Sequence, residues 1–126
     1  MRENEVAKRV LDFCFAIHRE LGPGLLESVY CEALALELEE AGLQYSREVH
    51  YPVHYKSRKL PIGFRTDFLI ENCLMVEVKS IESLAPVHKK KVLTYLRISK
   101  VRLGLLVNFN VALLKNGIVR LANNLY

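Results

Sequence analysis

The spacing of the hydrophobic residues changes near residue 45, and no other feature constrains the fold as much. Residues 4–21 place apolar side chains at the spacing of a helix. Residues 48–56 instead alternate apolar and polar side chains, which predicts a half-buried strand. The chain must therefore pack helices against a sheet. The apolar positions of the helix are Val6, Val10, Phe13, Ile17 and Leu21. Val49, Tyr51, Val53 and Tyr55 share one face of the strand, and we expect the two tyrosines to lie in the core.

Glycine and proline mark the ends of several elements. The Gly-Pro-Gly stretch at 22–24 ends the first helix, and a second helix of about 25–41 closes near Gly42. Pro52 lacks a backbone N–H, so its strand is an edge strand or carries a bulge. A third helix runs over about 85–99, with Pro86 in its first turn.

Four further segments have the pattern of strands. Residues 62–71 and 73–80 form a pair around a hairpin turn at Glu71 and Asn72, and the apolar run 101–109 is typical of a strand covered on both faces. A tight turn at 115–117 leads into a last strand at 118–122. The order α-α-β-β-β-α-β-β predicts an α/β fold in which helices flank a mixed sheet.

Length and composition favour one soluble domain over residues 1–126. The apolar runs are shorter than the roughly 18 residues that a membrane span needs. The charged N-terminus does not resemble a signal peptide, so we expect a cytoplasmic protein. Three cysteines without C-x-x-C spacing, Cys14, Cys31 and Cys73, then read as buried free thiols.

Charge is distributed unevenly along the chain. Residues 1–45 carry 4 Lys/Arg and 9 Asp/Glu, a net charge of −5, whereas residues 46–126 carry 14 and 5, a net charge of +9. A basic half suits a phosphate-rich partner such as nucleic acid. It also suits an ordinary soluble protein with a polarised surface.

Two charged residues alternate with hydrophobic ones in the strand 73–80. Glu77 and Lys79 share one strand face, while Val76 and Val78 face the other way. Asp67 lies ten residues before Glu77, across the predicted hairpin turn. A suitable register would bring both carboxylates and the lysine together at one end of the hairpin.

A third carboxylate comes from the second helix. Glu27 begins a stripe that continues with Tyr30, Leu34 and Leu38, so it lies on an otherwise apolar helix face. A buried carboxylate needs a partner, and the helix N-terminus contributes only about 0.3–1 kcal/mol. A nearby cation, or Lys79, would stabilise the charge of Glu27 more.

Three carboxylates and one lysine leave an excess of negative charge. Two carboxylates about 4 Å apart repel by roughly 4 kcal/mol at an effective dielectric constant of about 20. Either one carboxyl is protonated or a divalent cation binds, and hard oxygen ligands suit Mg²⁺ or Mn²⁺. Such a cation lowers the pKa of a bound water and neutralises charge on a phosphoryl oxygen. The same spacing also arises by chance in an ordinary cross-strand ion pair.

Two other groups of residues have a functional and a plain interpretation. His50 and His54 would lie about 13 Å apart along a strand, too far to share one metal, so we expect them to face solvent. The run Lys89, Lys90 and Lys91 is either a solvated helix face or a contact with a phosphate backbone.

Two motifs together resemble a known family. Residues 24–30 read Gly-x-x-Glu-x-x-Tyr, and residues 64–80 carry an Asp…Glu-x-Lys signature. With the segment 88–109, they resemble the GxxExxY proteins, a small prokaryotic group within the PD-(D/E)XK nuclease superfamily. The resemblance covers about residues 5–122. It implies a restriction-endonuclease-like core, with a helix, a three-stranded meander, a helix and a further strand.

The resemblance also implies roles for the residues of the site. Asp67, Glu77 and the backbone carbonyl of Val78 would bind the metal. Lys79 would act on the nucleophile. Glu27 would be a ligand of a second metal or would hold a water.

The third helix matches the family only in part. Tyr95 would support the site, but Lys91 stands four residues earlier where such proteins have Gln. Lys91 shares a helix face with His88, and it could contact a phosphate or compete with the metal for a carboxylate. Thr66 replaces the proline that precedes the aspartate in the name of the superfamily.

These features favour a Mg²⁺-dependent phosphodiesterase, an endonuclease or exonuclease, that acts on DNA in preference to RNA. The candidate contacts to nucleic acid are Lys89, Lys90, Lys91 and Arg65. The second hypothesis is a nuclease fold that binds nucleic acid or a protein without cutting. The third is a subunit whose homodimer interface is its main role, and a two-fold dimer also suits an enzyme that cuts both strands.

Overall fold

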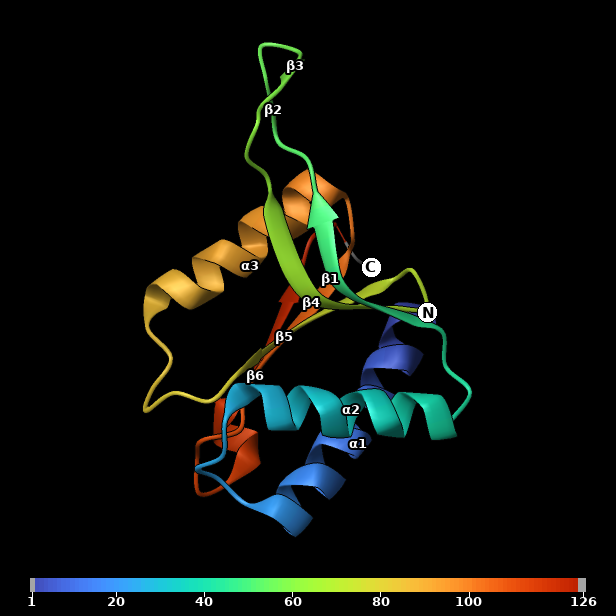
Figure 1. Cartoon of the computed structure of the whole chain (residues 1–126), viewed down its shortest axis with the longest axis vertical. Coiled ribbons are helices and arrows are strands. Elements are labelled where there is room, and N and C mark those ends of the chain that lie inside the picture. Colours follow the sequence, from blue (N-terminus) through green and yellow to red (C-terminus); the bar gives the residue numbers. More distant parts are fainter. Residues whose placement is uncertain (1, 125–126) are drawn as a thin grey trace.

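A mixed five-stranded sheet runs through the computed structural model, which describes residues 2–124 (Figure 1). β5 and β6 run parallel, and the other neighbouring strands are antiparallel. The parallel pair needs a crossover connection, which α3 (Pro86–Ser99) supplies. The spatial order is β1 (Tyr45–Tyr51), β4 (Phe64–Ile70), β5 (Leu74–Lys79), β6 (Leu103–Asn108) and β7 (Ile118–Ala122).

Helices cover both faces of this sheet. α1 (Arg2–Leu21) and α2 (Glu27–Glu40) pack on one face, and α3 packs on the other. Strand β5 is therefore buried on both sides: Val76 and Val78 face α1 and α2, whereas Met75 faces α3. The predicted α/β fold is confirmed, and the elements of the main sheet follow the predicted order.

Between β1 and β4 the chain leaves the main sheet and forms a projecting arm, residues 52–63, at the top of Figure 1. β2 (His54–Tyr55) and β3 (Arg58–Lys59) pair there as a separate two-stranded sheet. The predicted strand 48–56 is thus interrupted at Pro52, and β1 is an edge strand. Tyr55, which the alternation assigns to the core, is 64% exposed because no layer packs against the arm.

The two predicted turns have different outcomes. Three residues connect β4 to β5, because the last pair of the hairpin is Ile70 with Leu74. Glu71 and Asn72 lie in the turn as predicted, with φ of 52° and 54°, but Cys73 belongs to the loop and not to β5. The segment before β7 is instead a short 3₁₀-helix, η1 (Leu114–Gly117). Gly117 is needed there because a Cβ at its position would lie 2.2 Å from the carbonyl oxygen of Asn108.

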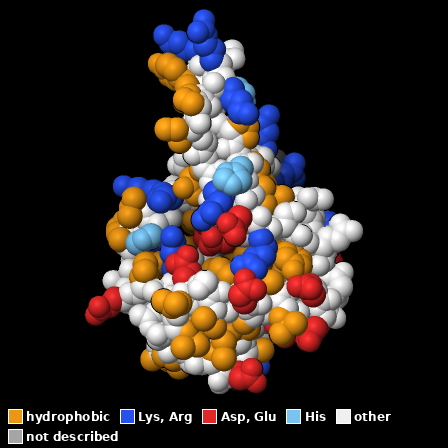
Figure 2. Space-filling view, in the orientation of Figure 1, with side chains coloured by type: hydrophobic (Ala, Val, Ile, Leu, Met, Phe, Trp, Pro, Cys, Tyr) orange, Lys and Arg blue, Asp and Glu red, His pale blue; other side chains and the backbone are white. Residues whose placement is uncertain are grey.

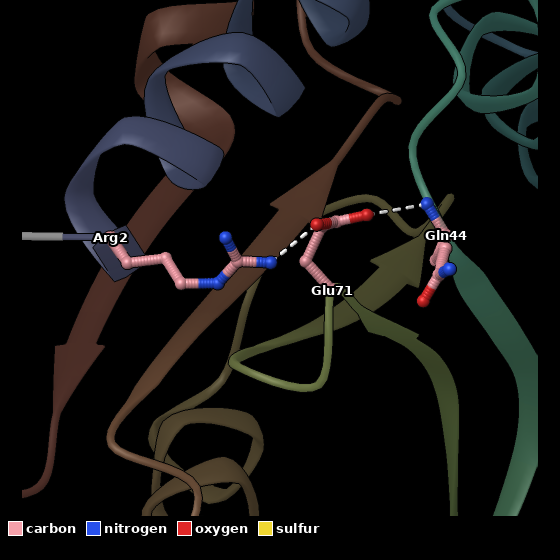
Figure 3. Close-up of polar contacts among 3 residues, drawn as sticks. All are labelled: Arg2, Gln44 and Glu71. Carbon is pink, nitrogen blue, oxygen red and sulfur yellow. Dashed lines mark hydrogen bonds and ion pairs between the residues drawn. The ribbon is translucent and has the colours of Figure 1, made fainter.

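A polar network fixes the turn end of the β4–β5 hairpin (Figure 3). Arg2 of α1 forms an ion pair with Glu71, and the other carboxylate oxygen of Glu71 accepts a hydrogen bond from the backbone N–H of Gln44 at 2.6 Å. These contacts, led by the Gln44 amide, lower the pKa of Glu71. The network joins the start of α1 and the segment before β1 to the hairpin turn.

Two further predictions concern the burial of the cysteine thiols and membrane-spanning helices. Cys14 and Cys31 are buried, and burial raises the pKa of both thiols to about 12. Cys73 is half-buried, so the prediction of a buried thiol is wrong there. Across residues 2–124, no helix combines the length and the apolar character needed to cross a membrane.

Candidate active site

The two strands of the β4–β5 hairpin separate at the end opposite the turn. Backbone pairing reaches Phe68 and Val76, and the same register would next pair Asp67 with Glu77. There the side chains replace the backbone bonds. Glu77 Oε2 accepts from the Asp67 N–H at 3.0 Å, and Asp67 Oδ2 accepts from the Val78 N–H at 2.8 Å. Beyond this point β4 continues with β1, and β5 continues with β6.

A cleft of about 180 Å³ lies where the strands separate. It collects side chains from α2, β4, β5 and α3, which are distant in the sequence. The four residues that the sequence assigns to catalysis all line it. The lining residues are Glu27, Arg65, Asp67, Glu77, Lys79, His88, Lys91, Val92, Tyr95 and Leu106.

Tyr30 holds the loop that leads into α2. Its hydroxyl donates to the Gly22 carbonyl at 2.6 Å and accepts from the Leu25 N–H at 3.2 Å. Its buried ring stacks on Phe109 with 4.4 Å between ring centroids. Gly24 in this loop has φ of 98°, a conformation that favours glycine. The glycine and the tyrosine of the Gly-x-x-Glu-x-x-Tyr motif therefore shape the loop.

The third residue of this motif, Glu27, reaches the cleft from the first turn of α2. The Ser80 hydroxyl donates to the Leu25 carbonyl at 2.6 Å and so ties the loop to the end of β5. Partial burial raises the pKa of Glu27, and the charge of Asp67 adds to this shift. Lys79 and the Ser80 backbone amide act in the opposite direction. The Glu27 carboxyl thus lies within electrostatic reach of both Asp67 and Lys79.

Glu77 is the most strongly perturbed carboxyl of the cleft. It is 8% exposed, and its pKa is raised to about 8, first by burial and then by the adjacent Asp67 carboxyl. Lys79 lowers this pKa only weakly. In the described residues, ion pairs join Arg2 to Glu71, Arg47 to Glu32 and Arg65 to Glu48. The cross-strand ion pair considered from the sequence is not among them, so no side-chain cation neutralises the Asp67–Glu77 pair.

The acidic pair suits a hard divalent cation. The contacts described above use Oδ2 of Asp67 and Oε2 of Glu77, which leaves Oδ1 and Oε1 as oxygen ligands. The N–H and C=O of one strand residue point to the same side, so the Val78 carbonyl also points toward Asp67. No group of three or more His, Cys, Asp or Glu side chains within residues 2–124 is arranged to hold a metal unaided. Water and phosphate would complete the coordination, as Mg²⁺ prefers.

Helix α3 forms one wall of the cleft. Lys91, His88 and Tyr95 line the cleft from one helix face, as their spacing predicts. His88 Nδ1 accepts from the backbone N–H of Ala85 at 2.9 Å, which fixes the imidazole at the start of α3. The ring of Tyr95 stacks on Phe64 with 4.1 Å between centroids, which joins this wall to β4.

The candidate nucleic-acid contacts do not share one position. Lys91 and Arg65 line the cleft, and Arg65 also donates to Glu48 at 2.9 Å. Lys89 and Lys90 are exposed on α3 and do not line the cleft.

Sequence reasoning missed Asn108, which is 1% exposed at the end of β6 and pairs in register with Lys79. Its side chain accepts from the Ile81 N–H at 3.1 Å and donates to the Ile81 carbonyl at 2.9 Å. The Lys79 carbonyl accepts from the Phe109 N–H at 2.9 Å. Asn108 therefore fixes the chain that follows Lys79. The available signal was a lone amide inside the apolar run 101–109.

The fold and the cleft define a class of protein. Three α-helices and a mixed five-stranded sheet in residues 2–124 are consistent with a restriction-endonuclease-like α/β fold. The family model described as the PD-(D/E)XK nuclease superfamily matches residues 4–121. The chain therefore belongs to the PD-(D/E)XK nuclease superfamily. No curated protein and no solved structure gives a significant match.

Proposed function

We propose that the cleft is the active site of a divalent-cation-dependent nuclease that hydrolyses phosphodiester bonds in DNA. The observation that carries this proposal is the Asp67–Glu77 pair. The two carboxyl groups are adjacent, Glu77 is buried, and no side-chain cation neutralises them. Burying such a pair is costly unless a proton or a cation compensates for the repulsion. Lys79 lines the same cleft.

Each residue then has a defined task. Asp67, Glu77 and the Val78 carbonyl hold Mg²⁺ or Mn²⁺, which supplies a bound water of lowered pKa and neutralises phosphoryl charge. The Lys79 ammonium orients the attacking water and stabilises negative charge on the phosphoryl group. Glu27 holds a further water or a second cation at the edge of the cleft.

The helix wall and its neighbours position the substrate. Tyr95 supports the wall through its stacking on Phe64. Lys91, together with Arg65, contacts phosphates that enter the cleft. The exposed Lys89 and Lys90 extend this contact along α3.

We also propose a narrower family, a compartment and an oligomeric state. The roles of Gly24, Glu27 and Tyr30 in the loop before α2 support membership of the GxxExxY group. Residues 1–126 act as one domain, in the cytoplasm, where the three thiols stay reduced. A two-fold dimer would present one cleft to each strand of a duplex.

A module that binds nucleic acid without cutting it is the second candidate. Lys91 favours this alternative, because it brings a positive charge to the cleft at the position where Gln was expected. Its ammonium could occupy the place of a cation beside the carboxylates.

Cation binding, measured by calorimetry in the wild-type protein and in Asp67→Asn, separates the two candidates. We expect a micromolar-to-millimolar Kd for Mg²⁺ or Mn²⁺ in the wild type and no binding in the variant, which keeps an oxygen for the Val78 N–H. Cleavage of plasmid DNA should require the cation and disappear in Asp67→Asn. Glu71→Gln, at the other end of the same hairpin, is the matched control and should retain both. DNA binding without cation binding or cleavage would select the binding module.

A further inference from the structure

The projecting arm, residues 52–63, carries basic side chains and no acidic ones. No acidic residue lies between Glu48 and Asp67 in the sequence. Three cations, Lys56, Arg58 and Lys59, are exposed near its tip. Figure 2 shows Lys and Arg side chains at the tip and along one side of the arm, with hydrophobic side chains along the other side.

The base of the arm sets its direction. The main ladder ends at Tyr51 and Phe64, and the arm resumes pairing at His54 and Lys59. Two residues, 52–53, bridge this gap on one strand and four, 60–63, on the other. Unequal lengths of this kind bend a ribbon, as a bulge does. Gly63 is required at the bend, because a Cβ there would lie 2.1 Å from the Tyr51 carbonyl oxygen.

Arg65 borders both the base of the arm and the cleft. A hollow of about 450 Å³ lies at the base of the arm, bounded in part by Pro52, Pro61 and Lys59. Arg65 lines both this hollow and the cleft that contains Asp67 and Glu77. A polyanion held by the arm would therefore pass over Arg65 on its way to the carboxylates.

We propose that the arm grips a DNA duplex and holds it against the cleft, with Lys56, Arg58 and Lys59 on backbone phosphates. This inference rests on the proposed function, since it names the substrate form that the cleft receives. The cations and the absence of acidic side chains complement a polyanion. A two-stranded ribbon is also the size that the major groove of about 12 Å admits, which favours a duplex over a single strand.

The apolar side of the arm fits the same partner. Tyr55 and Ile62 are 64% and 77% exposed, although they are large side chains. Lys56 lies over the Tyr55 ring, with 5.6 Å from its Nζ to the ring centroid, so the tip combines a cation with an aromatic surface. Beside phosphates, such side chains can contact the thymine methyl groups and base edges that face a groove.

The test measures binding of a short fluorescent DNA duplex by fluorescence anisotropy. The buffer contains EDTA, so that no divalent cation contributes to binding. The variant replaces the three arm cations together: Lys56→Gln, Arg58→Gln and Lys59→Gln. We expect affinity to fall at least tenfold. The slope of log K against log salt should become shallower by about 2 to 3, because up to three phosphate contacts are lost. Lys56→Arg with Lys59→Arg should retain binding.

The matched control removes the same charge elsewhere. Lys8→Gln, Arg9→Gln and Arg19→Gln change three exposed cations on α1, which packs on the sheet face opposite α3. This control should bind the duplex within about twofold of wild type. All six positions are exposed, so both variants should keep the circular dichroism spectrum and melting temperature of the wild type.

Several outcomes would overturn the inference while leaving the cation site untouched. Equal losses in the arm variant and the control would show that net charge alone drives binding. Tighter binding of single-stranded DNA, or binding of anionic vesicles but not of the duplex, would assign the arm to another partner. Cation binding by calorimetry does not involve the arm, so failure of the arm inference and failure of the nuclease proposal give different results.

Discussion

The two ends of the β4–β5 hairpin hold one glutamate each, and the two glutamates have opposite environments. At the turn, Glu71 has an arginine and a backbone amide as partners, and its pKa is lowered (Figure 3). At the open end, Glu77 is buried beside another carboxyl, and its pKa is raised to about 8. The two residues are six positions apart in the sequence. The carboxylate at the turn has an arginine as its partner, whereas the carboxyl pair at the open end has only backbone amides.

The difference lies in how far the surrounding groups match the charge of each carboxylate. Glu71 joins three segments, and its negative charge is matched by the groups around it. Asp67 and Glu77 accept one backbone N–H each, which is enough to hold their position but not to neutralise their charge. A bound cation would offset the repulsion that remains between the two carboxyl groups. Four predictions test this contrast, beginning with the largest expected effect.

Replacing Lys79 should separate catalysis from cation binding. We expect Lys79→Ala to lower the rate of DNA cleavage by about 10²–10³-fold, the usual cost of losing one charge-stabilising group. Cation affinity should not fall, because Asp67 and Glu77 remain and a positive charge near them is removed. Single-turnover cleavage and calorimetry measure the two quantities. Lys8→Ala on α1 is the control and should cleave normally; a Lys79→Ala protein that did so too would remove Lys79 from the mechanism.

Glu77→Gln should change the pH dependence of stability. The folded-state pKa of Glu77 is about 8 and the unfolded value about 4.5. The folded state therefore holds more protons between these values, and wild-type stability falls as pH rises through this window. The slope contributed by Glu77 is at most about 1.4 kcal/mol per pH unit. Chemical unfolding in EDTA should show this slope in the wild type and lose it in Glu77→Gln.

Glu71→Gln provides the control of opposite sign. The pKa of Glu71 is lowered, so its contribution to stability is present above the unfolded value and is lost as pH falls through the folded value. The variant should be less stable than wild type at neutral pH, whereas Glu77→Gln should be more stable at pH 8. If both variants changed the free energy of unfolding in the same direction, the contrast between the two ends of the hairpin would fail.

Divalent cations should stabilise the folded protein by binding to Asp67 and Glu77 at the open end of the hairpin. At a cation concentration of about 100 times Kd, linkage predicts a gain of about 2.7 kcal/mol. Thermal unfolding with and without Mg²⁺ or Mn²⁺ measures this gain. Glu71→Gln should gain as much as the wild type, and Asp67→Asn should gain nothing. An equal gain in Asp67→Asn would place the cation elsewhere.

Lys91→Gln should give the smallest effect. Removing one positive charge from the cleft should raise cation affinity by about 3–10-fold, equivalent to roughly 0.7–1.4 kcal/mol. DNA affinity should fall at the same time, because a phosphate contact is lost. Calorimetry and anisotropy on the same variant measure both. Weaker cation binding in Lys91→Gln would mean that Lys91 orders the carboxylates instead of competing with a cation.

The sequence predicted which residues lie together in the cleft better than it predicted the surface. Asp67 and Glu77 meet because the three-residue loop 71–73 fixes the register of the hairpin, and this information is local. Lys91 and Tyr95 line the cleft because helical spacing places them on one face. The separation of the strands was not predictable, because it depends on side chains that replace backbone carbonyls.

The arm shows why periodicity alone failed outside the core. The alternation that begins in β1 continues through Tyr55 in the sequence, yet the layer that it should face ends at Tyr51. The end of the main sheet is marked only by the two connections of unequal length, residues 52–53 and 60–63, that separate the two ladders. These connections depend on how distant segments pair, so the local pattern does not reveal them. Asn108 was missed for a similar reason, since its role depends on a loop that is distant in the sequence.

The unequal lengths of the two connections at the base of the arm, residues 52–53 and 60–63, have an evolutionary consequence. The ladder of β2 and β3 is in a different register from that of β1 and β4, so the outer hairpin can lengthen, shorten or change sequence without shifting a single pair in the main sheet. Selection can therefore act on the arm and on the Asp67–Glu77 cleft independently. A chain built in this way can exchange its outer hairpin while the geometry of the cleft stays constant.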